Sequence, residues 1–474
     1  SPAALLINAS IFILLRNFGC KITKKQDKSQ TYRNKKRNFA TKMNKRDHQI
    51  LQIAIPSIVS NITVPLLGMI DVAIVGHMGS AVYIGAVAVG SMIFNLVYWL
   101  FGFLRMGSSG LTSQALGRRD MVEVMRLLVS SVAIALGIAL LFIVLQTPMK
   151  WLMFWFIGPT ADVAPFASTY FDIVIWGAPA MLGLYSLLGW FIGMQNTRIP
   201  LFISIMQNIV NILASLTLVY GFGLKIEGVA MGTVIAQYAG FIVAVVLLMR
   251  YYGRLSRYFQ RKRLFRHIGV FFKVNRDIFL RTLCLVAVNL FFTSAGARSG
   301  AVILSVNTVL MQFYLFFSYF MDGFAYAGEA LGGKTFGARY TIALRETLQR
   351  LWMWASIVTG VYTLVYIFGG EWLVRLLTDE PQVREAAHAF IWWAWLIPAA
   401  GVMAFIWDGV FVGITATRGM LVSSFVAALL FFSTYYVLCG FIGNHALWLA
   451  QVVYLVTRGV VQTVWFRRLG ILSL

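Results

Sequence analysis

Long apolar stretches, separated by short polar segments, follow one another along most of this chain. An apolar run of about 20 residues is long enough for an α-helix to cross the hydrocarbon core of a bilayer. We mark six such stretches before a basic segment and six after it. The stretches cover residues 50–76, 82–116, 122–148, 164–194, 199–221, 227–252, 274–297, 301–333, 341–369, 383–416, 419–439 and 445–466. The pattern predicts an all-α membrane protein with twelve transmembrane helices.

Composition excludes the other broad classes of protein. Of the 474 residues, 59% are hydrophobic and 12% are charged, which is about half of the usual charged share of about 25%. A soluble protein has no way to bury so much apolar surface. The 14 Trp, 37 Phe and 19 Tyr also exclude a disordered chain. Three cysteines are too few for a disulfide framework or a zinc site.

The formal net charge of +23 would suggest a nucleic-acid partner in a soluble protein. Here the basic residues gather beside apolar stretches: twelve precede residue 50, and nine lie between Arg250 and Arg276. Basic residues flank membrane spans on the cytoplasmic side. We therefore expect both termini and the connector 253–272 to be cytoplasmic, and we expect membrane lipids as partners rather than nucleic acid.

The N-terminal segment has a separate interpretation. The chain begins with Ser1, and its first methionine is Met43. The apolar run 3–15 precedes its basic residues, whereas a signal peptide carries them first. We predict that residues 1–46 are a basic extension, disordered or a non-native start, with the functional protein beginning near Met43. An extra anchor helix is the alternative.

An internal repeat divides the chain into two halves. Equivalent residues recur at an offset of 220 positions: Gly193, Thr197 and Arg198 correspond to Gly413, Thr417 and Arg418. Such a repeat of six helices predicts two six-helix lobes related by a pseudo-two-fold axis along the membrane normal. The predicted N-lobe covers 47–252, the basic connector 253–272 and the C-lobe 273–474.

Asp71 is a carboxyl group near the outer end of the first apolar stretch, about 30 Å along a helix from Leu51. An ionisable residue within a span is costly and is a functional candidate by default. Burial disfavours the charged form, so we expect Asp71 to gain and lose a proton, with Pro65 bending the helix nearby. The alternative is a carboxylate that caps the helix at the membrane interface.

Charged residues within spans of the second half include Arg281, Asp322, Glu329 and Asp408. Asp322 and Glu329 are seven positions apart, which places them on one face of a helix. The four groups are predicted to form a C-lobe polar network that neutralises itself. A proton relay or a substrate contact remains the alternative.

Polar uncharged residues in the first half are candidates for a binding cavity. Any one of them alone, however, more often forms a hydrogen bond between two helices than a ligand contact. Asn208 and Asn211 are three positions apart and share a helix face. The sequence holds neither an HExxH zinc motif nor a phosphate-binding loop. We therefore expect no cofactor, no metal and no enzyme activity, with energy supplied by an ion gradient or by a partner.

Several longer motifs together carry a resemblance to a known family. They are IPSIVSNITVPLLGMIDVAIVGHMG within 53–79, the GxQNTR pattern from Gly193 to Arg198, NRDIFLRTL at 275–283, DGFAYAGEALGG at 322–333 and DGVFVG at 408–413. In these residues the region 47–468 resembles the MATE (multidrug and toxic compound extrusion) transporters of the MOP superfamily, in particular their DinF-like branch.

The resemblance implies export of bulky, often cationic compounds by alternating access, against entry of protons or sodium. The family's first-helix carboxylate corresponds to Asp71, the implied proton-coupling site. Ser215 stands where many relatives carry an aspartate, which makes sodium the less favoured ion. Asn208 and Asn211 are already candidates because they share a helix face. The full set of predicted substrate and cavity residues is Tyr170, Asn208, Asn211, Ser215 and Thr233.

We expect a monomeric proton-coupled antiporter in a bacterial inner membrane. The alternatives are a flippase for a lipid-linked sugar and an exporter of a specific organic anion. A flippase predicts several arginines in the cavity to bind a pyrophosphate, whereas the arginines deep within the spans are limited to Arg105, Arg281 and Arg458. A membrane-embedded enzyme would need clustered catalytic residues, and the sequence has none in a recognisable pattern.

Overall fold

The computed structural model describes residues 45–76, 81–260 and 268–471, and it describes no side chains for residues 64–72. The predicted N-terminal extension lies outside the described residues, apart from the start of the first helix. Within the described ranges the chain consists of helices and their connecting turns. Eleven of the helical segments are long and apolar enough to cross a membrane, and α3 (Lys45–Gly76) occupies the place of the first predicted span.

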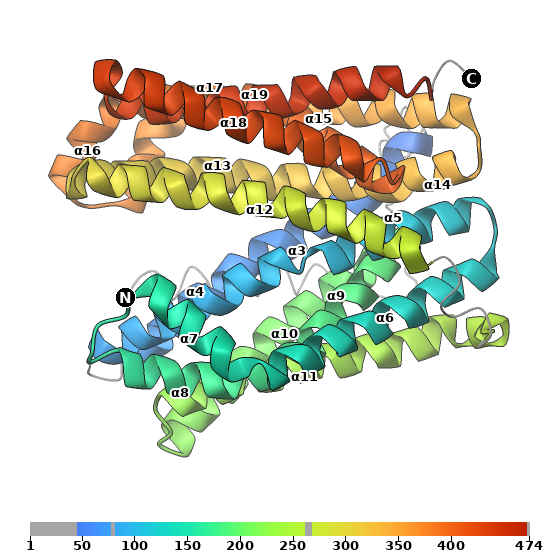
Figure 1. The fold of residues 1–474 in the computed structure, drawn as a ribbon, viewed down its shortest axis with the longest axis horizontal. Helices are drawn as coiled ribbons and strands as arrows, with labels where there is room; N and C mark the ends of the chain where they lie inside the picture. The colour runs from blue at the N-terminus through green and yellow to red at the C-terminus, as the bar shows by residue number, and fades with distance from the viewer. Residues whose placement is uncertain (1–44, 77–80, 261–267, 472–474) are drawn as a thin grey trace, which may run out of the picture. The chain divides into compact units, whose positions relative to one another are not determined.

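The helices form two groups, coloured blue to green and yellow to red in Figure 1. The N-lobe contains α3, α4 (Ala81–Leu100), α5 (Phe103–Gly117), α6 (Met121–Val144), α7 (Gln146–Ile157), α8 (Ala164–Val174), α9 (Ala178–Gly193), α10 (Arg198–Leu216) and α11 (Ile226–Tyr252). The C-lobe contains α12 (Ile268–Arg298), α13 (Ala301–Ala327), α14 (Gly333–Gly337), α15 (Thr341–Leu377), α16 (Pro381–His388), α17 (Ile391–Gly413), α18 (Thr417–Ile442) and α19 (Asn444–Arg468). The predicted all-α fold with two lobes is confirmed.

The helices differ from the predicted spans in several places. The chain between α6 and α8, which the pattern left as a loop, forms α7, and none of its residues is buried. Trp151 and Trp155 on α7 are exposed, as is typical of aromatic residues at a membrane interface. The predicted span 82–116 divides at Gly102 into α4 and α5. Helix α12 begins at Ile268, inside the predicted connector, because the helix continues beyond its apolar part.

Large apolar side chains cover the outside of the bundle as well as its interior. Phe368 is 86% exposed and Phe441 is 84% exposed. Surfaces of this kind are unfavourable in water and are suited to lipid chains. Fully buried Trp190 and Trp448 contribute to the interior of the N-lobe and the C-lobe. The packing is therefore that of a multi-pass membrane protein.

Backbone conformation supports the internal repeat. Four non-glycine residues within the described ranges have a positive φ: Arg119, Gln195, Arg339 and Thr415. This conformation is uncommon for side chains other than glycine. The four form two pairs, because Arg119 and Arg339 are 220 residues apart and so are Gln195 and Thr415. Equivalent turns therefore follow equivalent helices in the two lobes.

Candidate functional site

The two lobes are joined by a pair of equivalent hydrogen-bonded contacts. Gln114 Nε2 on α5 donates to Thr415 Oγ1 at 3.0 Å and to the Gly413 carbonyl at 2.9 Å. Lys334 Nζ on α14 donates to Gln195 Oε1 at 3.0 Å. Gln114 corresponds to Lys334, and Gln195 to Thr415, at the repeat offset of 220. The two contacts are therefore related by the pseudo-two-fold axis.

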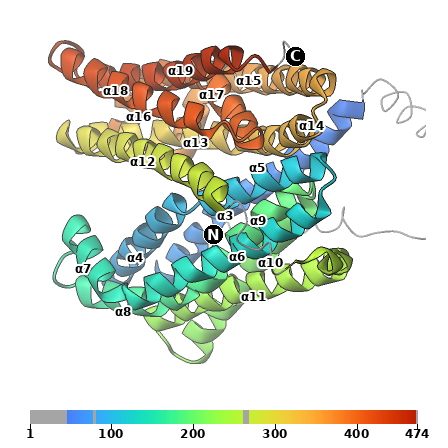
Figure 2. The ribbon, with the colours of Figure 1, turned by 45° about the vertical axis from the view of Figure 1, so that its right-hand side comes forward.

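Glycines bring α5 and α14 into direct backbone contact. A Cβ atom at Gly117 would collide with the backbone of Lys334, and one at Gly337 would collide with the backbone of Gln114. This pair of close approaches is again reciprocal under the repeat offset. Both views in Figures 1 and 2 place α5 beside α14. We call these contacts the inter-lobe seam, comprising Ser113, Gln114, Gly117 and Gln195 of the N-lobe and Gly333, Lys334, Gly337 and Thr415 of the C-lobe.

The seam lies at one end of the bundle, which we call the basic end. Seam residues are within five positions of turns that carry or adjoin basic residues, namely Arg118, Arg119, Arg198, Arg339 and Arg418. These turns connect helices of both lobes on the same side, since successive spans alternate in direction. The seam therefore closes the bundle at the end where basic residues gather.

A buried ion pair extends the inter-lobe contact toward the middle of the spans. Arg105 Nη1 on α5 lies 3.6 Å from Glu329 Oε2, and the two side chains are 13% and 2% exposed. The Arg105 guanidinium also stacks 4.2 Å from the centroid of the Tyr326 ring. Glu329 lies in a π-helical turn, Gly328–Gly332, a distortion often found at functional sites. Each lobe thus contributes one charge to a pair that is removed from water.

A second buried charge cluster lies wholly within the C-lobe. Asp408 Oδ2 on α17 accepts hydrogen bonds from Arg281 on α12 and, at 2.5 Å, from Arg458 on α19. Asp408 Oδ1 accepts a hydrogen bond from Gln462 Nε2 at 2.6 Å. Both carboxylate oxygens are therefore used, and charge-assisted bonds of this kind are the strong ones. We call these four residues the Asp408 cluster; it carries one more positive than negative charge.

The predicted C-lobe network is thus divided between two places. Arg281 and Asp408 contact each other, whereas Glu329 pairs with Arg105 of the other lobe. Asp322 is half-buried and lies within electrostatic range of Arg105 and Arg281. Arg105 also lies within range of both Asp322 and Glu329, as expected for two residues on one helix face.

Three of the predicted cavity residues meet where α10 packs against α11. Asn211 is fully buried and donates through Nδ2 to Thr233 Oγ1 at 3.3 Å. Ser215, one turn further along α10, is also fully buried and packs closely against Gly232. The structure brings these three side chains together along one helix–helix contact.

The remaining predicted N-lobe residues lie elsewhere. Asn208 Nδ2 donates to the Thr63 carbonyl on α3 at 2.9 Å. Tyr170 on α8 is buried, with its hydroxyl 3.4 Å from Ser91 Oγ on α4. Asp71 falls within α3, and its side chain lies outside the described ones. The predicted coupling role of Asp71 therefore stays a prediction.

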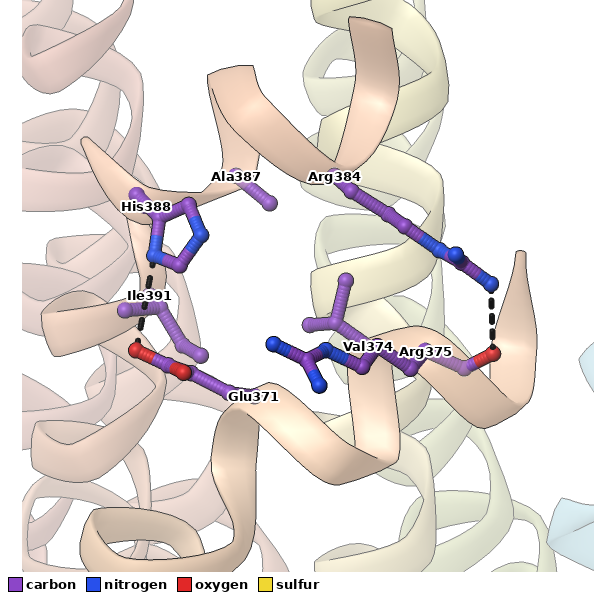
Figure 3. Close-up of a pocket in the computed structure, with 7 residues that line it drawn as sticks. All are labelled: Glu371, Val374, Arg375, Arg384, Ala387, His388 and Ile391. Atoms are coloured by element: carbon purple, nitrogen blue, oxygen red, sulfur yellow. Dashed lines mark hydrogen bonds and ion pairs between the residues drawn. The ribbon is translucent and has the colours of Figure 1, made fainter. Parts of the chain in front are cut away.

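A small pocket at the opposite end of the C-lobe contains other charged residues (Figure 3). His388 Nδ1 lies 3.5 Å from Glu371 Oε1, and Arg384 donates to the Arg375 carbonyl at 3.2 Å. The Glu371 and His388 side chains are each more than half exposed, and exposed ion pairs of this kind contribute little energy. None of the predicted site residues lines this pocket.

Sequence reasoning missed most of the inter-lobe contact. Arg105 and Arg458 were noted as arginines within spans without assigned partners, and Gln114 and Lys334 were not singled out. The repeat offset was the available signal, because it aligns Gln114 with Lys334 and Gln195 with Thr415. Because the residue types differ at these positions, identity between the two halves does not mark them.

Two six-helix lobes, an internal pseudo-two-fold repeat and a polar contact between the lobes define a class of multi-pass membrane transporters. The MatE family model matches residues 56–217 and 278–437. DNA damage-inducible protein F of Escherichia coli (strain K12) is 37% identical over 428 residues, which cover 89% of this chain and 92% of that protein. The chain belongs to the MATE transporter family.

More distant proteins share the same fold. Probable multidrug resistance protein NorM of Thermotoga maritima is 21% identical over 348 residues, which cover 71% of this chain and 73% of that protein. A crystal structure of MATE in the bent conformation matches with a TM-score of 0.80 at 16% identity, covering 91% of this chain and 99% of that one. The relatives and structural neighbours are transporters.

Proposed function

We propose that this protein is a secondary active antiporter that exports bulky, often cationic organic compounds in exchange for protons. Membership of the MATE family and the similarity to a protein named for multidrug resistance support the substrate class. We place it in a bacterial inner membrane as a monomer, with both termini and the basic end at the cytoplasm because of the positive-inside rule. A sodium gradient is the less favoured energy source.

The observation that carries the proposal is the reciprocity of the inter-lobe seam. Two structurally equivalent lobes meet through equivalent donors, Gln114 and Lys334, which bond to equivalent turns of the opposite lobe. Hydrogen bonds, one ion pair and backbone contacts at glycines can form and separate without exposing a large apolar surface. Such a contact suits two lobes that rock about a central site to alternate access. With the basic end at the cytoplasm, the arrangement is closed to the cytoplasm.

Asp71 is our proposed proton-coupling residue. When deprotonated, it attracts a cationic compound, so that the proton and the compound compete for one lobe. Each ligand then favours a different conformation through its differential affinity, which antiport requires. Asn208, Asn211, Ser215, Thr233 and Tyr170 are proposed to contact the substrate from the same lobe.

The Asp408 cluster supports an N-lobe location for the coupling proton. A proton placed on Asp408 would replace two guanidinium contacts that already neutralise it, and leaving buried charges unpaired is costly. Glu329 forms an ion pair with Arg105 of the other lobe. In our proposal these two carboxylates stabilise the C-lobe and the seam, respectively.

Export of an organic anion is the second candidate. The excess positive charge of the Asp408 cluster favours it, because Arg281 and Arg458 share a single carboxylate. A lipid-linked sugar flippase is less supported, since the third arginine within the spans, Arg105, is paired with Glu329.

The proposed function is tested with purified protein in liposomes under an imposed proton gradient. We expect the gradient to drive accumulation of a lipophilic cationic dye, with proton release that depends on the dye. A sodium gradient of equal size should drive little accumulation. Gradient-driven accumulation of an anionic dye, without the cationic one, would favour the second candidate and contradict the first.

A further inference from the structure

A groove on the outer surface of the C-lobe lies near the basic end, between α15, α17 and α19. It has a volume of about 710 Å³, within the usual range of small-molecule sites. Its rim carries three exposed polar side chains, Arg345 and Gln349 from α15 and Arg467 from α19. The lining includes two arginines and no acidic residue. Positive charge therefore gathers along the rim.

The floor of the groove is apolar and aromatic. Trp407 and Phe466 are buried, with tilted rings whose centroids are 4.5 Å apart, and Trp352 meets Trp407 edge-on at 5.8 Å. The Trp407 indole donates to Thr463 Oγ1 at 2.8 Å, so its polar atom is satisfied within the protein and the floor is left apolar. A cationic rim above an aromatic floor matches a ligand with an anionic head and hydrocarbon tails.

The position of the groove relative to the membrane further restricts the class of ligand that it can bind. Arg345 lies in the first turns of α15 and Arg467 in the last turn of α19, so both lie where a span meets the lipid headgroups. Arginine side chains at this level bind anionic lipid headgroups. From the charge of the rim and the apolar floor, we propose that the groove binds an anionic glycerophospholipid of the leaflet at the basic end.

In this proposal Arg345 and Arg467 contact the phosphate, Gln349 donates to its ester oxygens, and the acyl chains lie on Trp352, Trp407 and Phe466. The groove also adjoins the Asp408 cluster, because Trp407 precedes Asp408 on α17 and Thr463 follows Gln462 on α19. The bound lipid joins α15 to both of these helices and stabilises the C-lobe. The proposal does not depend on the transported compound.

Native mass spectrometry of the purified full-length protein tests the proposal. The protein is titrated with dioleoylphosphatidylglycerol and, separately, with dioleoylphosphatidylcholine. We expect one tightly retained phosphatidylglycerol and weaker retention of phosphatidylcholine. Arg345→Gln and Arg467→Gln should each weaken phosphatidylglycerol retention roughly fivefold, and the double variant roughly thirtyfold, from about 1 kcal/mol per arginine near an anionic lipid. Trp407→Leu should weaken both lipids, because it removes part of the floor.

Arg118→Gln is the matched control, since Arg118 is an exposed arginine at the basic end outside the groove. It should retain phosphatidylglycerol as the parent protein does. If Arg118→Gln loses as much phosphatidylglycerol retention as the groove variants, general surface charge binds the lipid. If the Arg345→Gln/Arg467→Gln double variant retains phosphatidylglycerol as the parent protein does, the groove is not the binding site. Displacement of the lipid by millimolar inorganic phosphate would also contradict the proposal, because a free anion would then be the ligand.

Discussion

Gln114 of α5 and Lys334 of α14 are equivalent residues of the two repeats, and each donates a hydrogen bond to a turn of the other lobe, Gln114 to the turn after α17 and Lys334 to the turn after α9. Those turns present Thr415 and Gln195, both with a positive φ. The pseudo-two-fold axis therefore passes between α5 and α14. If the lobes separate at the basic end, the Gln114–Thr415 and Lys334–Gln195 contacts both break. We therefore treat the seam as one unit that is either closed or open.

The glycine contacts of the seam give the first prediction. Gly117→Ala adds a Cβ that collides with the backbone of Lys334, and overpacking of this kind usually costs about 1–3 kcal/mol. We expect the closed seam to become less populated by roughly tenfold. The readout is maleimide labelling of a Ser109→Cys reporter in protein whose native cysteines are replaced by serine. Ser109 is fully buried on α5, one turn before the seam residue Ser113.

Gly137→Ala is the control for this experiment, because a Cβ at Gly137 meets no atom within 4 Å. It should leave reporter labelling unchanged and slightly stabilise α6, since alanine is a better helix former than glycine. Equal labelling in Gly117→Ala and the parent protein would show that the seam tolerates the added atom.

The Arg105–Glu329 pair gives the second prediction. Arg105→Gln or Glu329→Gln leaves the other charge buried without its partner, a loss that costs about 3–5 kcal/mol for buried pairs. Each single variant should increase labelling of the Ser109→Cys reporter, because opening the seam hydrates the remaining charge. The double variant should be less open than either single variant. Additive effects of the two substitutions would mean that the pair does not hold the seam closed.

The Asp408 cluster gives the third prediction, which concerns stability. Asp408→Asn leaves Arg281 and Arg458 facing each other without a carboxylate, so we expect the free energy of unfolding to fall by about 3–5 kcal/mol. Adding Arg458→Gln removes one of the unpaired charges and should recover part of the loss. Thermal unfolding in detergent measures both. If Asp408→Asn unfolds at the temperature of the parent, the cluster does not support the C-lobe.

The spans could be predicted because lipid demands about 20 apolar residues whatever the partners of a helix are. For this reason α13 and α17 were found from hydropathy alone. Helix α7 was missed because it lies at the surface with no buried residue, so its pattern resembles a loop rich in aromatic residues. At the division, the Gly102 N–H donates to the Trp99 carbonyl at 3.1 Å in a turn tighter than the α-helix, which hydropathy does not report.

Hydropathy along the chain does not predict which buried charges pair with each other. Glu329 and Asp408 both lie in apolar helices near arginines, and only the three-dimensional arrangement assigns Glu329 to Arg105 and Asp408 to Arg281. These partners are more than 100 residues apart in the chain. The sequence predicts Asn211 and Thr233 on neighbouring spans, but their mutual hydrogen bond depends on how α10 packs against α11.

The central claim, that one N-lobe carboxylate exchanges a proton for the substrate, is tested most directly by drug-induced proton release from Asp71→Asn protein. Asparagine mimics the protonated carboxyl at nearly constant volume, so the variant should fold and insert normally. In liposomes with an internal pH dye, we expect Asp71→Asn to lose proton release on addition of a lipophilic cation, whereas Asp172→Asn, which removes an exposed N-lobe carboxylate paired with Lys150, should keep it. Full drug-induced proton release from Asp71→Asn, with its loss in Glu329→Gln, would assign the coupling proton to the C-lobe and contradict the account.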